Sequence, residues 1–268
     1  MRTDAIALEE RRLEDVHDLE DYCSIHERHR IFPGIFEQRN HNKILDMAAG
    51  VGVVGKRIQD LYKTSDGTLD ITCNDISPKC LNVLKRNGLK TVSFSIDVEE
   101  EDFPFPDDTF DAVIALATIE HLINIDHFVA EIFRILKDGG CFYVSAPNYA
   151  GLTYLLPFLW SGKTFHDPLI PLDRYEFYAH IRYFTYRTLR DFVSSFGFAL
   201  EAVYIGVPES SSRYKALYAK SKLKALAFRT FMKLVSVCGS PRWASEPVLC
   251  FRKPHDGMDI GRPRKVVL

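Results

Sequence analysis

The chain has 268 residues, of which 46% are hydrophobic and 26% charged, a composition that excludes a disordered, collagen-like or small disulfide-stapled protein. Its richest apolar stretch, 154–160, is far shorter than the roughly 20 residues of a membrane-spanning helix. The net charge of −2 divides into −11 for residues 1–150 (16 basic, 27 acidic) and +9 for residues 151–268 (18 basic, 9 acidic). Because the second half carries the positive net charge, we expect an anionic partner to bind there.

Two helices are expected near the N-terminus, at 9–22 and 26–38, and from residue 43 short apolar strands alternate with amphipathic segments. The expected strands are 43–47, 69–74, 92–96, 111–116, 141–146, 198–204 and 247–251. The expected helices among them are 53–63, 78–87, 124–137 and 185–196. This alternation predicts a doubly wound α/β fold whose mostly parallel, seven-stranded sheet is covered on both faces.

Outside the strand–helix pattern, composition divides the chain further. The segment after the fifth strand is rich in aromatic residues, proline and histidine, and is expected to form a helical or loop-rich cap over an acceptor site. The expected division is an N-terminal helical lid at 1–40, a core at 41–205 and 246–252 that includes the cap at 148–184, a basic helical insertion at 207–245 and a tail at 253–268. Six cysteines without a C-x-x-C pair, and no signal peptide, predict reduced thiols in a cytoplasmic protein.

The loop after the first expected strand carries the clearest functional signal. Asp46 lies at the end of that strand, and small residues follow it, so that a ligand can approach the backbone and the N–H groups of a helix N-terminus. Gly50, Gly52 and Gly55 match the G-x-G-x-x-G fingerprint, which leaves an NAD(P)-dependent oxidoreductase as an alternative. Asp46 argues against it, because a carboxylate there repels a pyrophosphate but attracts an ammonium group.

Carboxylates also follow the next two strands. Asp75 ends the second strand, where it can accept hydrogen bonds from ribose hydroxyls. Asp97 follows the third strand, and the run Phe-Pro-Asp-Asp-Thr-Phe-Asp occupies 105–111. The alternative of a nicotinamide-dependent oxidoreductase gives no role to Asp97 or to this run. Asp46 and Asp75 therefore indicate a ligand that presents an ammonium group and ribose hydroxyls.

In these motifs the chain resembles the class I S-adenosylmethionine-dependent methyltransferases, of the type 11 kind that acts on small molecules, over about 26–205. The matching text is Leu45-Asp46-x-Ala48-x-Gly50-x-Gly52, Asp75-Ile76-Ser77-Pro78, Asp97 with the run at 105–111, Ile119-Glu120-His121-Leu122, Arg134-Ile135-Leu136-Lys137-Asp138-Gly139-Gly140 and Pro147-Asn148. The resemblance implies a Rossmann-like fold and S-adenosylmethionine as cofactor, with S-adenosylhomocysteine as product.

The resemblance also implies which residues hold the cofactor. Asp46 and the glycine backbone would hold its methionine part, Asp75 the ribose, and Asp97 with the Val98 N–H the adenine. The full set of implied positions is Arg30, Asp46, Ala48, Gly50, Gly52, Asp75, Ile76, Asp97, Val98, Leu116 and Ala117. Ala48 stands where the family has its first glycine, which leaves a non-catalytic, cofactor-binding or regulatory relative as a further alternative.

Methyl transfer from a sulfonium mainly requires alignment of the acceptor and exclusion of water, and a hydroxyl acceptor benefits from a histidine base. His121 follows the fourth strand and His180 precedes the last large helix, so both are candidate catalytic bases, and no metal is expected. The candidate acceptor-pocket residues are Asn148, Tyr149, His166, Tyr178 and Arg182. We expect a small or lipid-linked acceptor, methylated on oxygen.

A basic stretch at 213–233 contains seven lysines and arginines and no acidic residue. Its apolar residues recur near helical spacing, so it predicts an amphipathic basic helix. Such a helix fits peripheral contact with an anionic membrane, although a packed helix with solvated lysines gives the same pattern. Nucleic acid as acceptor is disfavoured because the first half is acidic and Ala117-Thr118-Ile119-Glu120 replaces a base-methylation motif.

Overall fold

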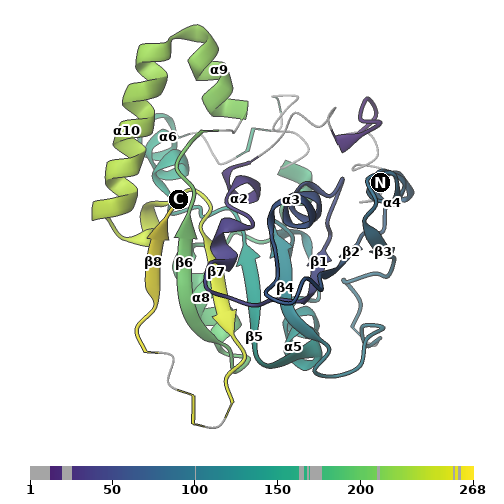
Figure 1. The fold of residues 1–268 in the computed structure, drawn as a ribbon. Coiled ribbons are helices and arrows are strands. Elements are labelled where there is room, and N and C mark those ends of the chain that lie inside the picture. The colour runs from purple at the N-terminus through teal and green to yellow at the C-terminus, as the bar shows by residue number, and fades with distance from the viewer. Residues whose placement is uncertain are drawn as a thin grey trace.

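Eight strands form one sheet at the centre of the molecule (Figure 1). The structure is a computed structural model that describes residues 13–19, 26–99, 101–162, 166–167, 169, 177–209, 212–255, 257–258 and 261–268. The strands are β1 (Lys43–Met47), β2 (Asp70–Asn74), β3 (Lys90–Val92), β4 (Phe110–Leu116), β5 (Leu136–Ser145), β6 (Ala199–Ile205), β7 (Val248–Arg252) and β8 (Arg264–Val267). Their order is β3-β2-β1-β4-β5-β7-β6-β8. Only β7, among these, is antiparallel to its neighbours, which confirms the doubly wound, mostly parallel α/β fold.

Two apolar clusters, one on each face of the sheet, form the core. The helices that pack on the sheet are α5 (Ile125–Ile135) and α8 (Tyr186–Ser194) on one face, and η2 (Gly34–Phe36), α3 (Val53–Leu61) and α4 (Pro78–Arg86) on the other. Because successive strand residues point to opposite faces, Leu45 and Val113 belong to the first cluster, and Ile44 and Ile114 to the second. Burial on both faces explains why these strands are continuously apolar.

Local capping fixes where the helices begin. The Ser77 hydroxyl accepts a hydrogen bond from the Cys80 N–H at 3.4 Å, and Pro78 occupies the first turn of α4. Helix α3 differs, because its N-cap is Gly52, in the left-handed conformation and without a side-chain cap. The N-cap residue therefore satisfies none of the first N–H groups of α3 with a side chain.

The sheet has one strand more than the sequence predicts. Residues 264–267, which lie in the expected tail, form β8 and pair in parallel with β6. Glu201 on β6 joins this edge through Arg264 and also binds Arg39 and Arg252. These guanidinium groups hold the pKa of Glu201 at about 2, below its usual value, despite its partial burial. The prediction of a seven-stranded sheet was therefore wrong. β8 was missed because it pairs with β6, which lies about sixty positions earlier in the chain.

The third strand and the N-terminal helices also differ from expectation. β3 covers 90–92 rather than 92–96. The helix expected at 26–38 is interrupted: α2 (Glu27–Arg30) ends before Pro33, and η2 follows. Proline disfavours a helical conformation at the residue before it, so the single predicted helix was wrong. Half of the helix expected at 9–22 lies outside the described residues, and the described half, 13–19, contains no α-helix, so that part of the prediction was wrong.

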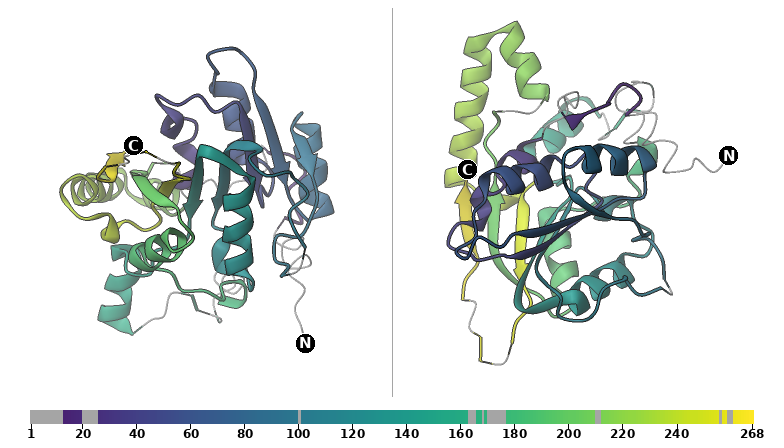
Figure 2. Two further views of the ribbon diagram at one scale, coloured as in Figure 1. Left: turned by 90° about the horizontal axis from the view of Figure 1, so that it is seen from below. Right: turned by 45° about the vertical axis from the view of Figure 1, so that its right-hand side comes forward.

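Beyond β5 the chain adds helices that stand outside the sheet layers. They are α6 (Leu152–Ser161), α9 (Ser212–Lys220) and α10 (Lys222–Cys238), followed by η4 (Pro241–Trp243). Figures 1 and 2 show the α9–α10 hairpin projecting past the sheet beside β8. Within the described residues no helix is both long and apolar enough to cross a bilayer. The five described cysteines form no disulfide, and Cys23 lies outside the described residues.

Candidate functional site

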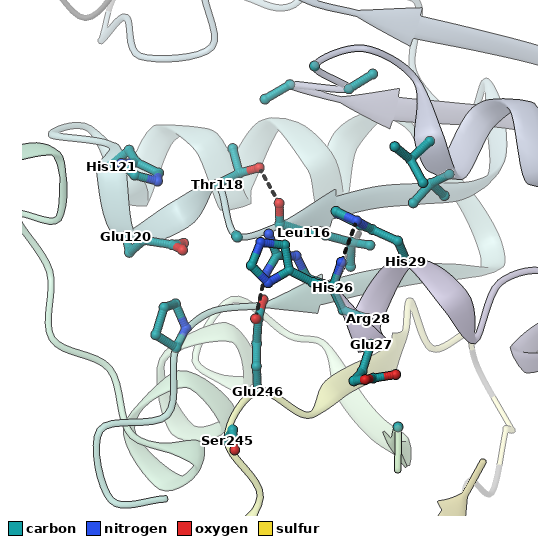
Figure 3. A pocket seen from close by; sticks show the side chains of 18 of the residues that line it. His26, Glu27, Arg28, His29, Leu116, Thr118, Glu120, His121, Ser245 and Glu246 are labelled. Carbon is teal, nitrogen blue, oxygen red and sulfur yellow. Dashed lines mark hydrogen bonds and ion pairs between the residues drawn. The ribbon is translucent and has the colours of Figure 1, made fainter. Parts of the chain in front are cut away.

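A cavity of about 640 Å³ opens at the carboxyl ends of β1, β2 and β4, the edge where open α/β sheets bind ligands. The site residues predicted from the sequence that line it are Asp46, Ala48, Gly50, Asp75, Ile76, Asp97, Leu116, Ala117, His121, His166 and His180. Figure 3 shows Glu120 and His121 on one side of this cavity and the segment from His26 to His29 on the other. Most of the predicted residues are thus brought together around one space.

The loop after β1 takes a backbone shape that favours glycine. Ala48, Gly50 and Gly52 have φ angles of 49°, 58° and 87°. At Gly52 a Cβ atom would lie 2.5 Å from Leu84 Cδ2, and at Gly55 one would lie 2.8 Å from Cys73 Sγ. Gly52 and Gly55 therefore let α3 pack closely on its neighbours, whereas nothing lies within 4 Å of a Cβ at Gly50. The third glycine of the fingerprint has a packing role here.

Asp46 places a buried carboxylate at the edge of the cavity. Its residue is 4% exposed, and Oδ2 has no hydrogen-bond partner among the described residues. Burial, with a smaller contribution from the Asp75 charge, raises the pKa of Asp46 to about 7. A buried polar atom without a partner is costly. The carboxylate is therefore suited to a cationic ligand group such as the ammonium of S-adenosylmethionine.

Asp75 and Asp97 hold the loops that border the cavity. Asp75 Oδ2 accepts a hydrogen bond from the Gly50 N–H and Oδ1 from the Ser77 N–H, both at 2.8 Å. Asp97 accepts hydrogen bonds from the N–H groups of Ile123 and Asn124, at 2.9 and 2.7 Å, just before α5. Each carboxylate thus has a capping role. Because a carboxylate offers about four acceptor positions, this role leaves capacity for ligand hydroxyl or amino groups.

Two predicted acceptor residues form a buried hydrogen-bonded group with His180. The Tyr149 hydroxyl lies 2.8 Å from His180 Nδ1 and 3.1 Å from His166 Nε2. The ring of His180 also contacts that of His121, with centroids 4.7 Å apart. His121 Nδ1 lies 3.0 Å from the Ala179 carbonyl oxygen. A carbonyl only accepts, so in neutral His121 the proton is on Nδ1 and the basic lone pair on Nε2.

Other predicted residues lie outside the cavity lining. Arg30 donates to the carbonyl oxygens of Val207 and Leu268, and so holds the end of β8 rather than the cavity. Arg182 donates to the Ile123 carbonyl oxygen at 2.7 Å. Asn148 donates to the Ala244 and Arg242 carbonyl oxygens. The remaining predicted residues that do not line the cavity are Gly52, Val98, Tyr149 and Tyr178.

The cavity also contains residues that the sequence did not single out. Arg28 binds Glu246, and Glu246 accepts a hydrogen bond from Ser145 Oγ at 2.8 Å. Glu120 is fully buried beside His121. The Glu120-His121 pair was visible in the sequence as part of a motif, whereas Arg28 and Glu246 are 218 positions apart and no local pattern connects them.

Two groups among the described residues bring three potential metal-ligand atoms within 4.8 Å of one another. One is Glu120, His121 and His180 at the cavity. The other, Cys141, Glu201 and Cys250, lies in the core next to Arg39, which binds Glu201 and lies 3.2 Å from Cys141 Sγ. Methyl transfer from a sulfonium requires no metal at either group. The expectation that the protein binds no metal stays a prediction.

The chain is similar to known methyltransferases in sequence and in structure. Residues 45–144 match the family model of a methyltransferase domain. A sterol methyltransferase-like protein of Botryococcus braunii is 32% identical over 132 residues, which are 47% of this chain and 32% of that protein. A ubiquinone/menaquinone biosynthesis C-methyltransferase of Bartonella tribocorum is 36% identical over 107 residues (38% and 40%). A malonyl-[acyl-carrier protein] O-methyltransferase of Geobacter sulfurreducens is 30% identical over 129 residues (47% of each).

The chain thus spans a third to a half of the length of these curated relatives. A solved structure from Thermotoga maritima, described as a possible histamine N-methyltransferase, matches with a TM-score of 0.58 at 13% identity over 92% of this chain and 96% of that one. An S-adenosylmethionine-dependent methyltransferase from Archaeoglobus fulgidus matches with a TM-score of 0.54 at 14% identity (93% and 100%). Both solved structures share the α/β fold of this chain.

The left-handed backbone at Ala48 gives a stability prediction. That conformation costs a non-glycine residue about 1–2 kcal/mol, and glycine loses about 0.5–1 kcal/mol through its greater freedom when unfolded. Ala48→Gly is therefore expected to raise the free energy of unfolding by about 0.5–1 kcal/mol, measured by urea denaturation. The control is Ala49→Gly, at a neighbour without positive φ that packs on the core. An equal loss of stability in both variants would contradict the prediction.

Proposed function

We propose that the chain transfers a methyl group from S-adenosylmethionine to a small or lipid-linked acceptor, a proposal that the match of residues 45–144 to a methyltransferase domain supports. The observation that carries this proposal is the convergence of Asp46, Asp75 and Asp97 on one cavity. The cofactor supplies a methyl group on a positively charged sulfur. The side chains of this chain bind and orient the reactants and exclude water.

The cofactor-binding part of the proposal follows from the charges around the cavity. The buried Asp46 carboxylate would bind the ammonium group, and the open N-terminus of α3 would offer N–H groups to the carboxylate of the methionine part. Asp75 would bind the ribose hydroxyls, and Asp97 the adenine amino group. Asp75 accepts a hydrogen bond from the Gly50 N–H, and Asp97 accepts one from the Asn124 N–H. These hydrogen bonds support the assignment, because they fix both carboxylates before a ligand binds.

The acceptor part of the proposal rests on the other end of the cavity. Tyr154, Phe228 and Met232 make this part of the lining apolar, as expected for an apolar or lipid-linked acceptor. Two relatives are named for sterol and for ubiquinone or menaquinone, and a third for malonyl-acyl carrier protein, so that both carbon and oxygen methylation occur among them. The histidines at the cavity favour a hydroxyl acceptor, and thus methylation of oxygen.

In this proposal His121 is the general base. Its Nε2 lone pair would accept the hydroxyl proton while the acceptor oxygen forms its bond to the methyl carbon, the methyl–sulfur bond breaks and S-adenosylhomocysteine leaves. The Ala179 carbonyl holds the opposite ring nitrogen, which fixes the tautomer. His180, held by Tyr149 and packed against the His121 ring, orients that base.

Cofactor binding is testable by titration calorimetry with S-adenosylmethionine. The wild type is expected to bind, and Asp75→Ala to weaken binding by about tenfold or more, since a charge-assisted hydrogen bond contributes about 1.5–3 kcal/mol. Asp70→Asn, at the exposed start of the same strand, is the matched control and should bind normally. No binding by the wild type, undiminished binding by Asp75→Ala, or fluorescence enhancement of NADH instead, would remove the assignment.

The raised pKa of Asp46 predicts that cofactor binding releases a proton. In the free protein Asp46 has a pKa of about 7, and an ammonium group beside it would lower that pKa. Binding should therefore strengthen as pH rises towards 7, by up to about tenfold per pH unit, and level off above. Calorimetry in buffers of different ionisation enthalpy measures the proton count. Asp46→Asn should abolish the proton release, and its persistence in this variant would exclude Asp46 as its source.

The role of His121 is testable with hydroxyl-bearing quinols and sterols, with S-adenosylhomocysteine as the measured product. His121→Gln should lower kcat by about 10²–10⁴-fold while the KM for S-adenosylmethionine stays near the wild-type value. His127→Gln, on α5 and outside the cavity lining, is the control. Unchanged kcat in His121→Gln would exclude it as the base and favour a carbon or nitrogen acceptor.

A further inference from the structure

The α9–α10 hairpin presents two different faces. Phe228, Met232 and Ser236 of α10 line the cavity, and Met232, Ser236 and Ala225 are buried. These residues recur at spacings of three and four, so they share one side of the helix. That side forms part of the cavity wall.

The opposite side of α10 is apolar and exposed to solvent. Leu223, Leu226, Leu234 and Val237 are 78%, 57%, 61% and 50% exposed, and Phe231 beside them is 52% exposed. At 100° per residue these side chains form one stripe along the helix, with the exposed Thr230 at its middle. An apolar stripe of this length is costly in water and indicates an interaction surface.

Basic residues flank the apolar stripe on both sides. Lys222, Arg229 and Lys233 follow one edge and Lys224 the other, as the helical spacing places them. The described hairpin, 212–238, contains seven basic residues and no acidic one. Arg229 of the hairpin forms an ion pair with Glu209.

We propose that the α9–α10 hairpin lies on an anionic lipid surface, with its apolar stripe among the acyl chains and its lysines at the headgroups. An apolar face bordered by lysine and arginine is the pattern of helices that lie in a membrane interface. A second copy of this chain fits less well, because two hairpins of the same positive charge repel each other. The absence of acidic residues in the hairpin favours a surface that is uniformly negative.

A second helix at the cavity, α6, also exposes apolar side chains. Thr153 and Tyr154 of α6 line the cavity that α10 also lines, while Leu159 and Trp160 of α6 are 69% and 94% exposed. Tryptophan is enriched at the interface between lipid and water. Both helices therefore turn one side to the cavity and apolar side chains to solvent.

This arrangement deepens the proposed function and rests on it for the acceptor. One helix, α10, forms the wall between the proposed lipid surface and the cavity. An acceptor with a lipid tail would then reach the methyl-transfer site directly from the membrane, without passing through water. The substrate class that this placement fits is a membrane-resident lipid.

Vesicle flotation tests the lipid surface without cofactor or acceptor. The full chain is mixed with vesicles of phosphatidylcholine alone, or of phosphatidylcholine with roughly one-third phosphatidylglycerol. Binding is expected only with the anionic vesicles, and it should fall when salt rises from about 0.1 M to about 1 M, because the Debye length shortens from about 10 Å to about 3 Å. Equal binding to both vesicle types, or to neither, would overturn the proposal.

Matched variants separate the hairpin from the rest of the surface. Leu223→Glu is expected to weaken vesicle binding about tenfold, and Leu223→Glu with Leu234→Glu to abolish it. Leu61→Glu, at an exposed leucine on α3 (59% exposed), should bind as the wild type does. Thermal unfolding checks that each variant is folded. Retained binding in the double variant, or a wild-type dimer that it converts to a monomer, would overturn the lipid surface.

The proposed function and the lipid surface can fail separately. S-adenosylmethionine binding is measured without vesicles, and vesicle binding without S-adenosylmethionine. Loss of cofactor binding with intact flotation would leave the hairpin assignment standing, and absent flotation with intact cofactor binding would overturn the hairpin assignment alone.

Discussion

The burial of one carboxylate at the end of β1 is the constraint on which the site depends. Asp46 lies beneath the glycine loop, and its neighbour Asp75 adds a second negative charge. In the isolated protein this arrangement is unfavourable for ionised Asp46, because desolvation outweighs the one backbone hydrogen bond that lowers its pKa. A cationic ligand would offset that penalty, so the buried carboxylate favours a ligand with an ammonium group.

The other two strand-end carboxylates show that capping and ligand binding are compatible. Asp75 holds the glycine loop against the start of α4, and Asp97 holds the loop before α5. Neither side chain has to move to face the cavity. Pre-organisation of this kind reduces the entropy lost on binding, which gives a physical reason for finding the same residues at the helix starts and at the cavity.

Sequence alone predicted the parts of the fold that depend on local patterns. The strand ending in Asp46, the Gly50–Gly52 turn and the helix capped by Ser77 were expected within a residue or two, since alternation, glycine and capping signals are all local. β8 was missed because its partner strand lies about sixty residues earlier in the chain, and β3 was displaced. Arg30 was assigned to the cofactor, yet its carbonyl partners at Val207 and Leu268 lie at the far end of the sequence, where no local signal points to them.

The same distinction divides the site into two halves. The family match ends at residue 144, and it contains all three strand-end carboxylates together with His121. Tyr149, His166, His180 and the cavity face of α10 come later in the chain. In the proposed function, the carboxylates of the cofactor half thus lie within the matched residues, whereas most of the acceptor half comes from segments that the match does not cover. We therefore expect selectivity for the acceptor to arise mainly from those segments, of which α10 places a cavity wall and an apolar surface flanked by cations on the same helix.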